Sequence, residues 1–378
     1  MNLVTNFSEA DERWMRFALA LSEKAQGFTA ENPNVGCVII DKNGNLCASG
    51  FTQKAGRPHA EQVALDKAGH KAINGTMYVT LEPCSHFGKT PPCATAIIES
   101  GISRVVIATI DPDKRVNGAG VDMLRLAELQ VDTMLLQSEA EKLLSSFLAR
   151  NAPMHHKTAE SIKRKPFITA KIAHTIDGFV SPAKGIGGQI SNQVSSAYVH
   201  DVRSRVDAVL ISEKTARIDN PRLDARIDGI NHPTTRIILD RNLLLSADSQ
   251  LVKTANMHPL VLISAQQADD NHWLNHANSS QNIRLFVVDK SFSLEIIFEM
   301  LLEEGFGHIL IEPGPRLLNS LLSERLVDEF IEIISPTPLG SGLSINNSEE
   351  TVAFLLPSPY VISNEFNLAD DTLKIWKR

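Results

Sequence analysis

A histidine and two cysteines in the first half of the chain have the types and spacing that suit metal binding. His59 begins the run His59-Ala60-Glu61, and Cys84 and Cys93 follow with eight residues between them. One imidazole and two thiolates leave a tetrahedral zinc ion with one open position, whereas structural zinc sites use four protein ligands. Glu61 comes two residues after His59 and is therefore expected to face a zinc-bound water rather than the ion.

These residue types suit the hydrolytic removal of an amino group from a pyrimidine-like ring. Zinc lowers the pKa of its bound water from about 15.7 to about 7, which makes hydroxide available at neutral pH. Glu61 would take the proton of that water and deliver it to the ring and the departing amine, a contribution of roughly 10²–10⁴-fold. The order His-x-Glu, then Pro-Cys and a second cysteine, is that of zinc deaminases, although two residues commonly separate the cysteines.

The same residues admit two other readings, a structural zinc module and a nucleic-acid-editing deaminase. The structural module needs a fourth ligand, and His86 is the nearby candidate. The editing enzyme needs a basic surface for phosphates, but the formal net charge is −7 over 378 residues. We therefore expect no nucleic-acid partner. Cys37 and Cys47 lie in strand-like runs, and we interpret them as core residues.

The segments around the metal-binding residues alternate between strand and helix patterns. Apolar spacing predicts helices over residues 9–21, 59–68 and 94–100, and Ser8 is a suitable N-cap for the first. Strands are expected at 35–40 and 46–51, joined by a hairpin turn, and at 77–81 and 104–110. This alternation indicates a layered α/β domain.

The chain is long enough for two domains. We place the first at 1–150, a polar linker with two prolines at 151–165, and the second at 166–378. Strand candidates in the second domain are 167–172, 208–211, 237–239, 261–263, 285–288, 308–311 and 330–334.

No apolar run approaches the ~20 residues of a membrane span, and neither a signal peptide nor a disulfide framework is indicated. We expect a cytoplasmic protein without a membrane partner.

The segment from Thr80 to Cys93 resembles the zinc segment of the bifunctional deaminase–reductases of riboflavin biosynthesis, which have this long spacer between the cysteines. Asn32–Gly36, Ala55–Glu61 and Asp111-Pro112 match as well, and the likeness covers nearly the whole chain. It implies an N-terminal cytidine-deaminase-like α/β/α sandwich and a C-terminal dihydrofolate-reductase-like α/β domain. It also implies Zn²⁺ and NADPH as cofactors, small phosphorylated pyrimidine substrates, and a homodimer or larger oligomer formed through the second domain.

In that family, 2,5-diamino-6-(5-phosphoribosylamino)pyrimidin-4-one loses its amino group, and NADPH then reduces the ribosyl group to ribityl. The family's zinc ligands fall on His59, Cys84 and Cys93, and its proton shuttle falls on Glu61. Substrate contacts fall on Asn34, His86, Lys89, Lys171, Arg203, Leu223, Arg226 and Glu312. Cofactor contacts fall on Ala173, Ser191, Thr215, Asp219, Gly314, Pro315, Arg316, Leu317, Leu318, Asn319 and Ser320. The alternatives without a functional role are a turn residue for Asn34 and solvent-exposed residues for His86, Lys89 and Lys171.

Five positions depart from the family pattern. Thr52 replaces a common histidine, Gly187 and Gln189 replace a serine and an aromatic residue, Ser212 replaces a glycine, and Pro313 replaces a small residue. Loss of a ring and a hydroxyl would weaken ligand binding by about a few kcal/mol if both contacts mattered. A second hypothesis is therefore an active deaminase with a non-catalytic reductase-like domain for binding or dimerisation. The presence of Arg203, Asp219, Arg226 and Glu312 together favours two activities.

Overall fold

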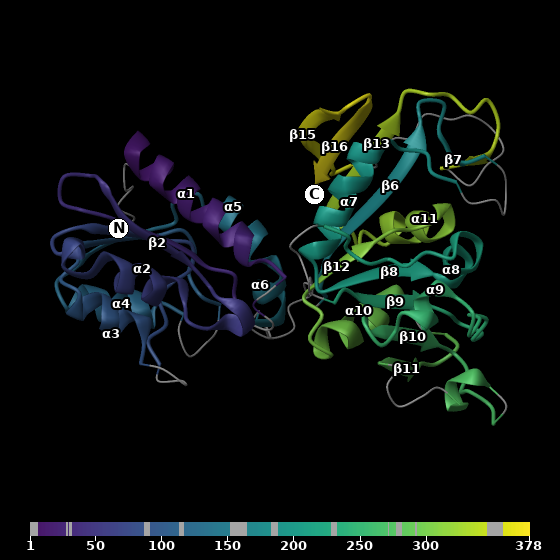
Figure 1. Ribbon diagram of the computed structural model, residues 1–378, viewed down its shortest axis with the longest axis horizontal. Helices are drawn as coiled ribbons and strands as arrows, with labels where there is room; N and C mark the ends of the chain where they lie inside the picture. The colour runs from purple at the N-terminus through teal and green to yellow at the C-terminus, as the bar shows by residue number, and fades with distance from the viewer. Residues whose placement is uncertain are drawn as a thin grey trace. The chain divides into compact units, whose positions relative to one another are not determined.

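The computed structural model describes residues 7–27, 29, 32–86, 91–112, 117–151, 165–182, 188–227, 233–270, 272–276, 282–291, 293–345 and 358–378. The chain divides into two compact units, Met1–Lys163 and Arg164–Arg378 (Figure 1). Nearly all of the linker expected at 151–165 lies outside the described residues. None of the described helices is both long enough and apolar enough to cross a bilayer.

The first unit contains a five-stranded sheet in the order β2-β1-β3-β4-β5. The expected hairpin forms, since β1 and β2 pair antiparallel, and β1 also runs antiparallel to β3. Strands β3, β4 and β5 are parallel. The bounds are β1 Gly36–Ile40, β2 Leu46–Phe51, β3 Thr76–Val79, β4 Arg104–Ile107 and β5 Gln130–Thr133.

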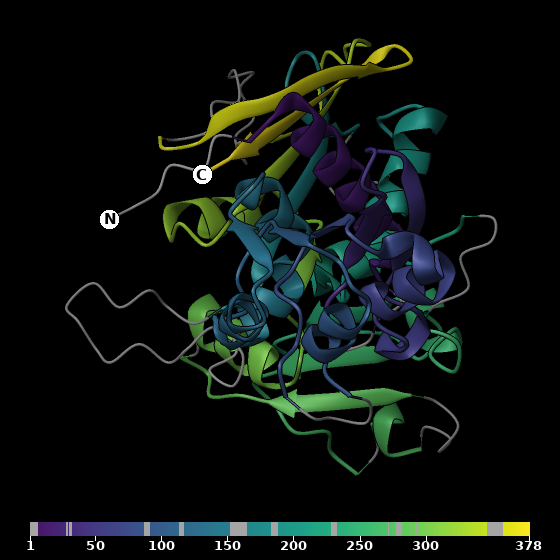
Figure 2. The same cartoon turned by 90° about the vertical axis from the view of Figure 1, so that its left-hand side faces the viewer.

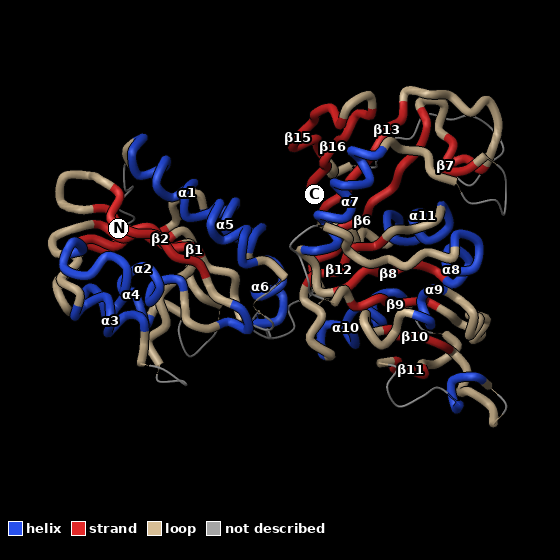
Figure 3. The backbone as a smooth tube through the Cα atoms, viewed as in Figure 1, coloured by secondary structure: helices blue, strands red, loops and turns tan. Residues whose placement is uncertain are grey.

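Helices cover both faces of this sheet (Figure 3). On one face α1 and α5 pack against Val38, Tyr78 and Val106, and on the other α2, α3 and α4 pack against Cys37 and Met77. Alternate strand residues point to opposite faces, so each strand supplies both cores. The helices are α1 Glu9–Ala25, α2 Ala60–Ala68, α3 Cys93–Glu99, α4 Ala119–Leu126, α5 Gln137–Leu143 and α6 Ser145–Asn151, with short 3₁₀ turns at Lys54–Gly56 and Gly69–Ala72. The predicted α/β/α sandwich is confirmed.

A buried carboxylate ties α1 to the sheet. Asp11 accepts hydrogen bonds from the Tyr78 hydroxyl at 2.8 Å, from Arg104 Nη1 at 2.6 Å and from the Ser8 hydroxyl at 2.8 Å. Arg104 also binds Asp132 at 2.8 Å. Burial alone would raise the pKa of Asp11, but the bonds from Arg104 and Ser8 hold it well below its usual value. Asp11 is therefore ionised in the folded protein.

We expect Asp11→Asn to lower the free energy of unfolding by roughly 2 kcal/mol at pH 7. The pKa of Asp11 is lower in the folded protein than in the unfolded chain, where it is about 3.9. The carboxylate therefore stabilises the fold above about pH 4, and this stabilisation is lost as the pH falls further. The difference between variant and unmodified chain should therefore shrink towards pH 3. Urea denaturation at both pH values measures it, with the exposed Asp66→Asn as control. An equal difference at both pH values would contradict this account.

The second unit contains a nine-stranded sheet in the order β11-β10-β9-β8-β12-β6-β13-β16-β15. The strands from β11 to β13 run parallel, and β16 and β15 add antiparallel at one edge. The bounds are β6 Phe167–Thr175, β8 Ala208–Ser212, β9 Thr235–Leu239, β10 Leu260–Ser264, β11 Ile283–Val287, β12 His308–Ile311, β13 Glu329–Ser335, β15 Val361–Leu368 and β16 Asp371–Lys377. A small sheet pairs β7 Phe179–Ser181 with β14 Leu343–Ser344. All of the expected strands form.

Helices lie on both faces of the large sheet as well. One face carries α10 and α11, and the other carries α8 and α9, with α7 over β13 and β16. The bounds are α7 Gln193–Ser204, α8 Glu213–Asp219, α9 Gln250–Lys253, α10 Leu294–Glu303 and α11 Pro315–Ser323, with a 3₁₀ turn at Trp273–His276. In such sheets ligands bind outside the carboxyl ends of the parallel strands. This edge is therefore the first place to look for a binding site.

Candidate active sites in the two units

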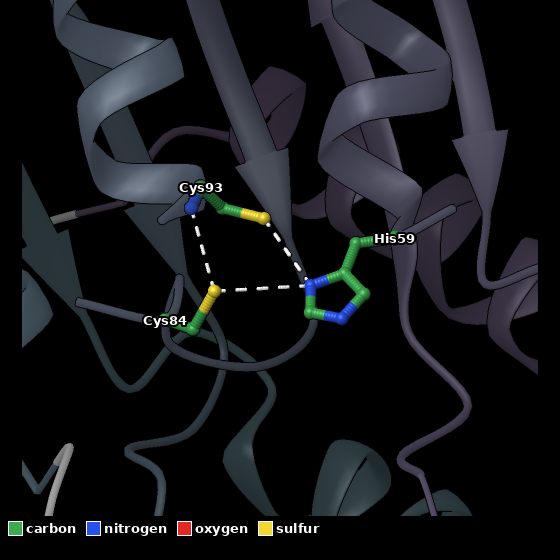
Figure 4. A group of neighbouring side chains, drawn as sticks. All are labelled: His59, Cys84 and Cys93. Carbon is green, nitrogen blue, oxygen red and sulfur yellow. Dashed lines mark hydrogen bonds between the residues drawn. The ribbon is translucent and has the colours of Figure 1, made fainter. Parts of the chain in front are cut away.

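The three residues predicted to bind zinc lie together in the first unit (Figure 4). Their ligand atoms are all within 4.8 Å of one another. His59 Nδ1 is 3.3 Å from Cys93 Sγ and 3.8 Å from Cys84 Sγ. A tetrahedral ion with bonds of about 2.0 Å to nitrogen and 2.3 Å to sulfur holds its ligand atoms roughly 3.5–3.8 Å apart. The donor set therefore fits zinc in both chemistry and spacing.

Each ligand occupies the start of a helix or the loop that leads to one. His59 is the extended residue that precedes α2, Cys93 is the first residue of α3, and Cys84 follows β3. The Cys93 amide donates to Cys84 Sγ at 3.3 Å, and helix N-termini favour negative charge. The hydrogen bond from the Cys93 thiol lowers the pKa of Cys84 to about 4, against the opposing effect of burial. These contacts favour the thiolate form of Cys84, the form in which cysteine binds zinc, and Cys93 would also lose its proton on zinc binding.

Glu61 is buried in the first turn of α2, with 4% of its surface exposed. Burial raises the pKa of this carboxyl group, while the nearby His59 acts in the opposite direction. The Glu61 carboxyl also interacts with the Cys93 thiol, which places it beside the ligand set. A buried carboxyl group with a raised pKa is suited to exchanging a proton near neutral pH.

Glu82 holds the Cys84 loop in place, a role that the sequence analysis missed. Its buried carboxylate accepts four backbone N–H bonds, from Asp111 at 3.2 Å, Gly118 at 2.9 Å, Gly120 at 2.8 Å and Val121 at 3.2 Å. Two of these donors belong to the first turn of α4. The residue two positions before Cys84 is therefore tied to the loop after β4.

Gly120→Ala is expected to weaken zinc binding by about 10–100-fold, as loss of residues that support metal ligands does. A Cβ atom at Gly120 would lie 2.1 Å from the Pro83 carbonyl oxygen, so the chain next to Cys84 must move. In an open helix the same change would stabilise the protein. Zinc content after dialysis against a graded chelator measures the effect, and the exposed Ala119→Ser is the control. Unchanged zinc affinity would show that the contact does not position Cys84.

The expected substrate contacts of the first unit differ in their surroundings. Asn34 is buried, and its amide nitrogen donates to the Leu143 carbonyl at 3.0 Å and to Ser22 Oγ at 3.2 Å. Thr52 exchanges hydrogen bonds with the backbone of Val35, so this departure supports the loop that carries Asn34. His86 is exposed after Cys84, and Lys89 lies outside the described residues.

The second unit has a cavity of about 780 Å³ outside the carboxyl ends of β6, β8 and β12. It brings together most of the residues expected there: Lys171, Ala173, Ser191, Thr215, Asp219, Glu312, Gly314, Pro315, Arg316, Leu317 and Ser320. Arg203, Leu223, Arg226, Leu318 and Asn319 do not line it, and the Leu223 and Leu318 side chains are buried in the core. Lys214 and Arg241 line the cavity although no motif singles them out.

Glu312 organises the charged side of this cavity. Its carboxylate binds Lys171 Nζ at 2.9 Å and Arg203 Nε at 2.6 Å. Burial would raise the pKa of Glu312, but these two cations hold it well below its usual value. Glu312 is therefore ionised, and it fixes a lysine on β6 and an arginine on α7 relative to each other.

Two further departures from the family pattern, Gln189 and Ser212, have hydrogen-bond partners in the structure. Gln189 lines the cavity, and its amide donates to the Ser191 carbonyl at 3.0 Å and to Ser196 Oγ at 2.9 Å. Ser212 caps α8 and lies 3.1 Å from the Thr215 hydroxyl. Pro313 also lines the cavity, and Gly187 lies outside the described residues. Gln189, Ser212 and Pro313 therefore all line the cavity, two of them with polar side chains.

Two family models match the chain, one in each unit. Residues 8–109 match the cytidine and deoxycytidylate deaminase zinc-binding region, and residues 166–363 match the RibD C-terminal domain. The riboflavin biosynthesis protein RibD of Aquifex aeolicus is 37% identical over 90% of both chains. RibD of Escherichia coli is 34% identical and covers 88% of this chain and 89% of its own.

Two solved structures are similar in fold to this chain over nearly its full length. A diaminohydroxyphosphoribosylaminopyrimidine deaminase/5-amino-6-(5-phosphoribosylamino)uracil reductase from Thermotoga maritima is 29% identical, with a TM-score of 0.82 over 97% of this chain and 98% of its own. RibD of Acinetobacter baumannii gives a TM-score of 0.80 at 28% identity over 98% and 99%. These likenesses confirm the cytidine-deaminase-like and reductase-like folds. The chain therefore belongs to the RibD family of riboflavin biosynthesis proteins, and it joins a zinc-dependent deaminase to a reductase.

Proposed function

We propose that His59, Cys84 and Cys93 hold the catalytic zinc ion and that Glu61 is the proton shuttle of the deaminase. The observation that carries this assignment is the convergence of the three ligand atoms within 4.8 Å. When bound, zinc supplies a water molecule whose pKa is about 7. Glu61 would take one proton from the attacking water and deliver it to the ring nitrogen, and would then carry the second proton, from the newly formed hydroxyl group, to the amino group, which leaves as ammonia. A fourth ligand such as His86 would close the site, but His86 is exposed and outside the cluster.

The substrate that we propose for this unit is 2,5-diamino-6-(5-phosphoribosylamino)pyrimidin-4-one. The printed name of the Thermotoga maritima relative supports it. Asn34, His86 and Lys89 are the side chains that we propose to contact the pyrimidine. The hydrogen bonds of the Asn34 amide nitrogen to Ser22 and Leu143 orient its carbonyl oxygen, which leaves that oxygen as the acceptor for a ligand.

For the reductase we propose NADPH as the cofactor, bound in the cavity at the carboxyl ends of β6, β8 and β12. When bound, NADPH supplies the hydride that opens the ribosyl group to ribityl. The proposed cofactor contacts are Ala173, Ser191, Thr215, Asp219 and the segment 314–320, in which Leu318 would act through its backbone. The proposed substrate contacts are Lys171, Arg203, Leu223, Arg226 and Glu312. The cavity volume supports a ligand of this size.

Purified protein is expected to oxidise NADPH when it is given the deaminated ribosyl phosphate, with much lower activity on NADH. Absorbance at the nicotinamide band follows the reaction. Glu312→Gln should lower turnover, because it releases both Lys171 and Arg203. A protein that binds zinc and deaminates but does not oxidise NADPH would return the second unit to a binding or dimerisation role.

We also propose that the enzyme is a homodimer or larger oligomer, formed through the reductase unit. Strand β15 is the last strand of its sheet (yellow in Figure 2) and is exposed along nearly its whole length. Val361, Ile362 and Phe366 are apolar side chains on it, and they are 64%, 43% and 41% exposed.

The four free thiols support a reducing compartment, and we propose the cytoplasm.

A further inference from the structure

Arg226 is held by two acceptors on one side of its guanidinium group. Arg226 Nη1 lies 2.5 Å from Asp224 Oδ1, and Arg226 Nη2 lies 3.1 Å from His200 Nε2. His200 is on α7, one helical turn before Arg203, and residues three apart share a helix face. Arg203 Nη1 and His200 Nδ1 both approach the Asp224 carbonyl oxygen, at 3.4 and 3.0 Å. Helix α7 and the loop after α8 thus bring two guanidinium groups around one imidazole.

The contact with Arg226 determines the protonation state of His200. A guanidinium group has only donors, so His200 Nε2 must accept from Arg226. The ring proton is then assigned to Nδ1, which lies 3.0 Å from the Asp224 carbonyl oxygen, and the Arg226 backbone nitrogen approaches the same ring nitrogen at 3.2 Å. A doubly protonated ring has no acceptor and would repel Arg226.

The charges around the ring favour this neutral form. Burial lowers the pKa of His200 first, and the charges of Arg203 and Arg226 lower it further, while Asp224 opposes them. The Asp224 carboxylate is buried and also binds Arg222 Nε at 2.9 Å, so it is shared between two arginines. More than half of the Arg226 side chain is exposed, so its remaining N–H groups can donate to a ligand oxygen.

We propose that His200 and Asp224 are positioning residues that hold Arg226 beside Arg203 for the phosphate of the reductase substrate. This inference rests on the proposed function, because it takes the proposed substrate contacts Arg203 and Arg226 and assigns the substrate's phosphate to them, since guanidinium groups bind phosphate oxygens in pairs. Neither positioning residue touches the reacting atoms. His200 contributes the lone pair of its neutral ring, and Asp224 contributes a carboxylate oxygen and a carbonyl oxygen. Phosphate affinity should therefore weaken once the pH falls below the pKa of His200.

Three variants separate this role from a general effect on the fold. His200→Ala should raise KM for the ribosyl phosphate about tenfold, with kcat within about twofold, and should weaken inhibition by inorganic phosphate by a similar factor. His200→Gln keeps an acceptor that does not titrate, so its KM should stay near that of the unmodified enzyme. Its KM should also rise less than that of the unmodified enzyme between pH 7.5 and pH 5.5. The exposed Gln193→Ala on the same helix is the control.

The outcomes are distinguishable. Unchanged KM and unchanged phosphate inhibition in His200→Ala would overturn the role of His200, as would equal pH profiles for His200→Gln and the unmodified enzyme. If the unmodified protein does not oxidise NADPH, the proposed reductase activity fails. Calorimetric titration of the same variants with the ribosyl phosphate then tests the anion site alone. Equal affinity of the unmodified and His200→Ala proteins for the ribosyl phosphate, or no binding to either protein, would overturn the proposed role of His200.

Discussion

Glu61→Gln is expected to lower the deamination rate by about 10²–10⁴-fold while zinc stays bound. Glutamine has nearly the same shape as glutamate but cannot take up or release the catalytic proton. The proposed zinc ligands are His59, Cys84 and Cys93, so the substitution removes none of them. Zinc content by elemental analysis and ammonia release from the diaminopyrimidine substrate measure the two effects on one preparation.

The control for this variant is Glu99→Gln, which changes an exposed glutamate at the end of α3. It should keep both zinc and deamination. NADPH oxidation on the deaminated intermediate should be normal in both proteins, since the cavity lies in the other unit. Deamination within about tenfold of normal in Glu61→Gln would remove Glu61 from the proton transfer.

Cys84→Ala is expected to abolish stoichiometric zinc binding and to reduce deamination below detection. Without Cys84 only His59 and Cys93 remain of the ligand group found among the described residues, and two protein ligands cannot hold zinc as three do. Reduction of the supplied intermediate should survive, because the second unit has its own core. Elemental analysis and the two activity assays on the same protein measure this outcome.

Cys47→Ala is the matched control, because it removes a half-buried thiol of β2 that lies outside the zinc group. It should retain zinc and both activities. If Cys84→Ala instead loses reduction as well, the zinc site supports the fold of the whole chain and is more than a catalytic centre.

The zinc site was predictable because its residues have rare chemistry at short spacing. His59, Cys84 and Cys93 lie within 35 positions of one another, and the helix starts that carry two of them show in the apolar pattern. The Glu82 contact was not predictable in the same way. A buried carboxylate that binds backbone amides depends on the path of the loop after β4, and no side-chain pattern records that path.

In the second unit, the buried parallel strands were predictable and the edge was not. Strands such as β8 and β10 are continuous apolar runs, as expected for strands covered on both faces. Strand β15 is exposed along almost all of its length, so it has no apolar period to detect. In β16, buried Leu373 and Ile375 alternate with Thr372 and Lys374, and such alternation is typical of a half-buried strand.

The surroundings of the cavity and of Arg203 and Arg226 could not be predicted from the sequence either. Arg203 and Arg226 were placed on the phosphate by resemblance, but their common partner Asp224 and the ring of His200 come from elements more than twenty positions apart. Lys214 and Arg241 reach the cavity from the ends of different strands. Charged residues at such positions look like any solvated lysine or arginine until the sheet order is known.

The four amide bonds to Glu82 also explain how zinc deaminases of different families can differ in the spacing of their cysteines. Cys84 is anchored from the residue two positions before it, and Cys93 is anchored by the helix that it begins. The coordination geometry is therefore set from outside the interval between them. Insertions and deletions in that interval can accumulate during evolution without moving either sulfur atom, which leaves its length and sequence available for adaptation to a new substrate.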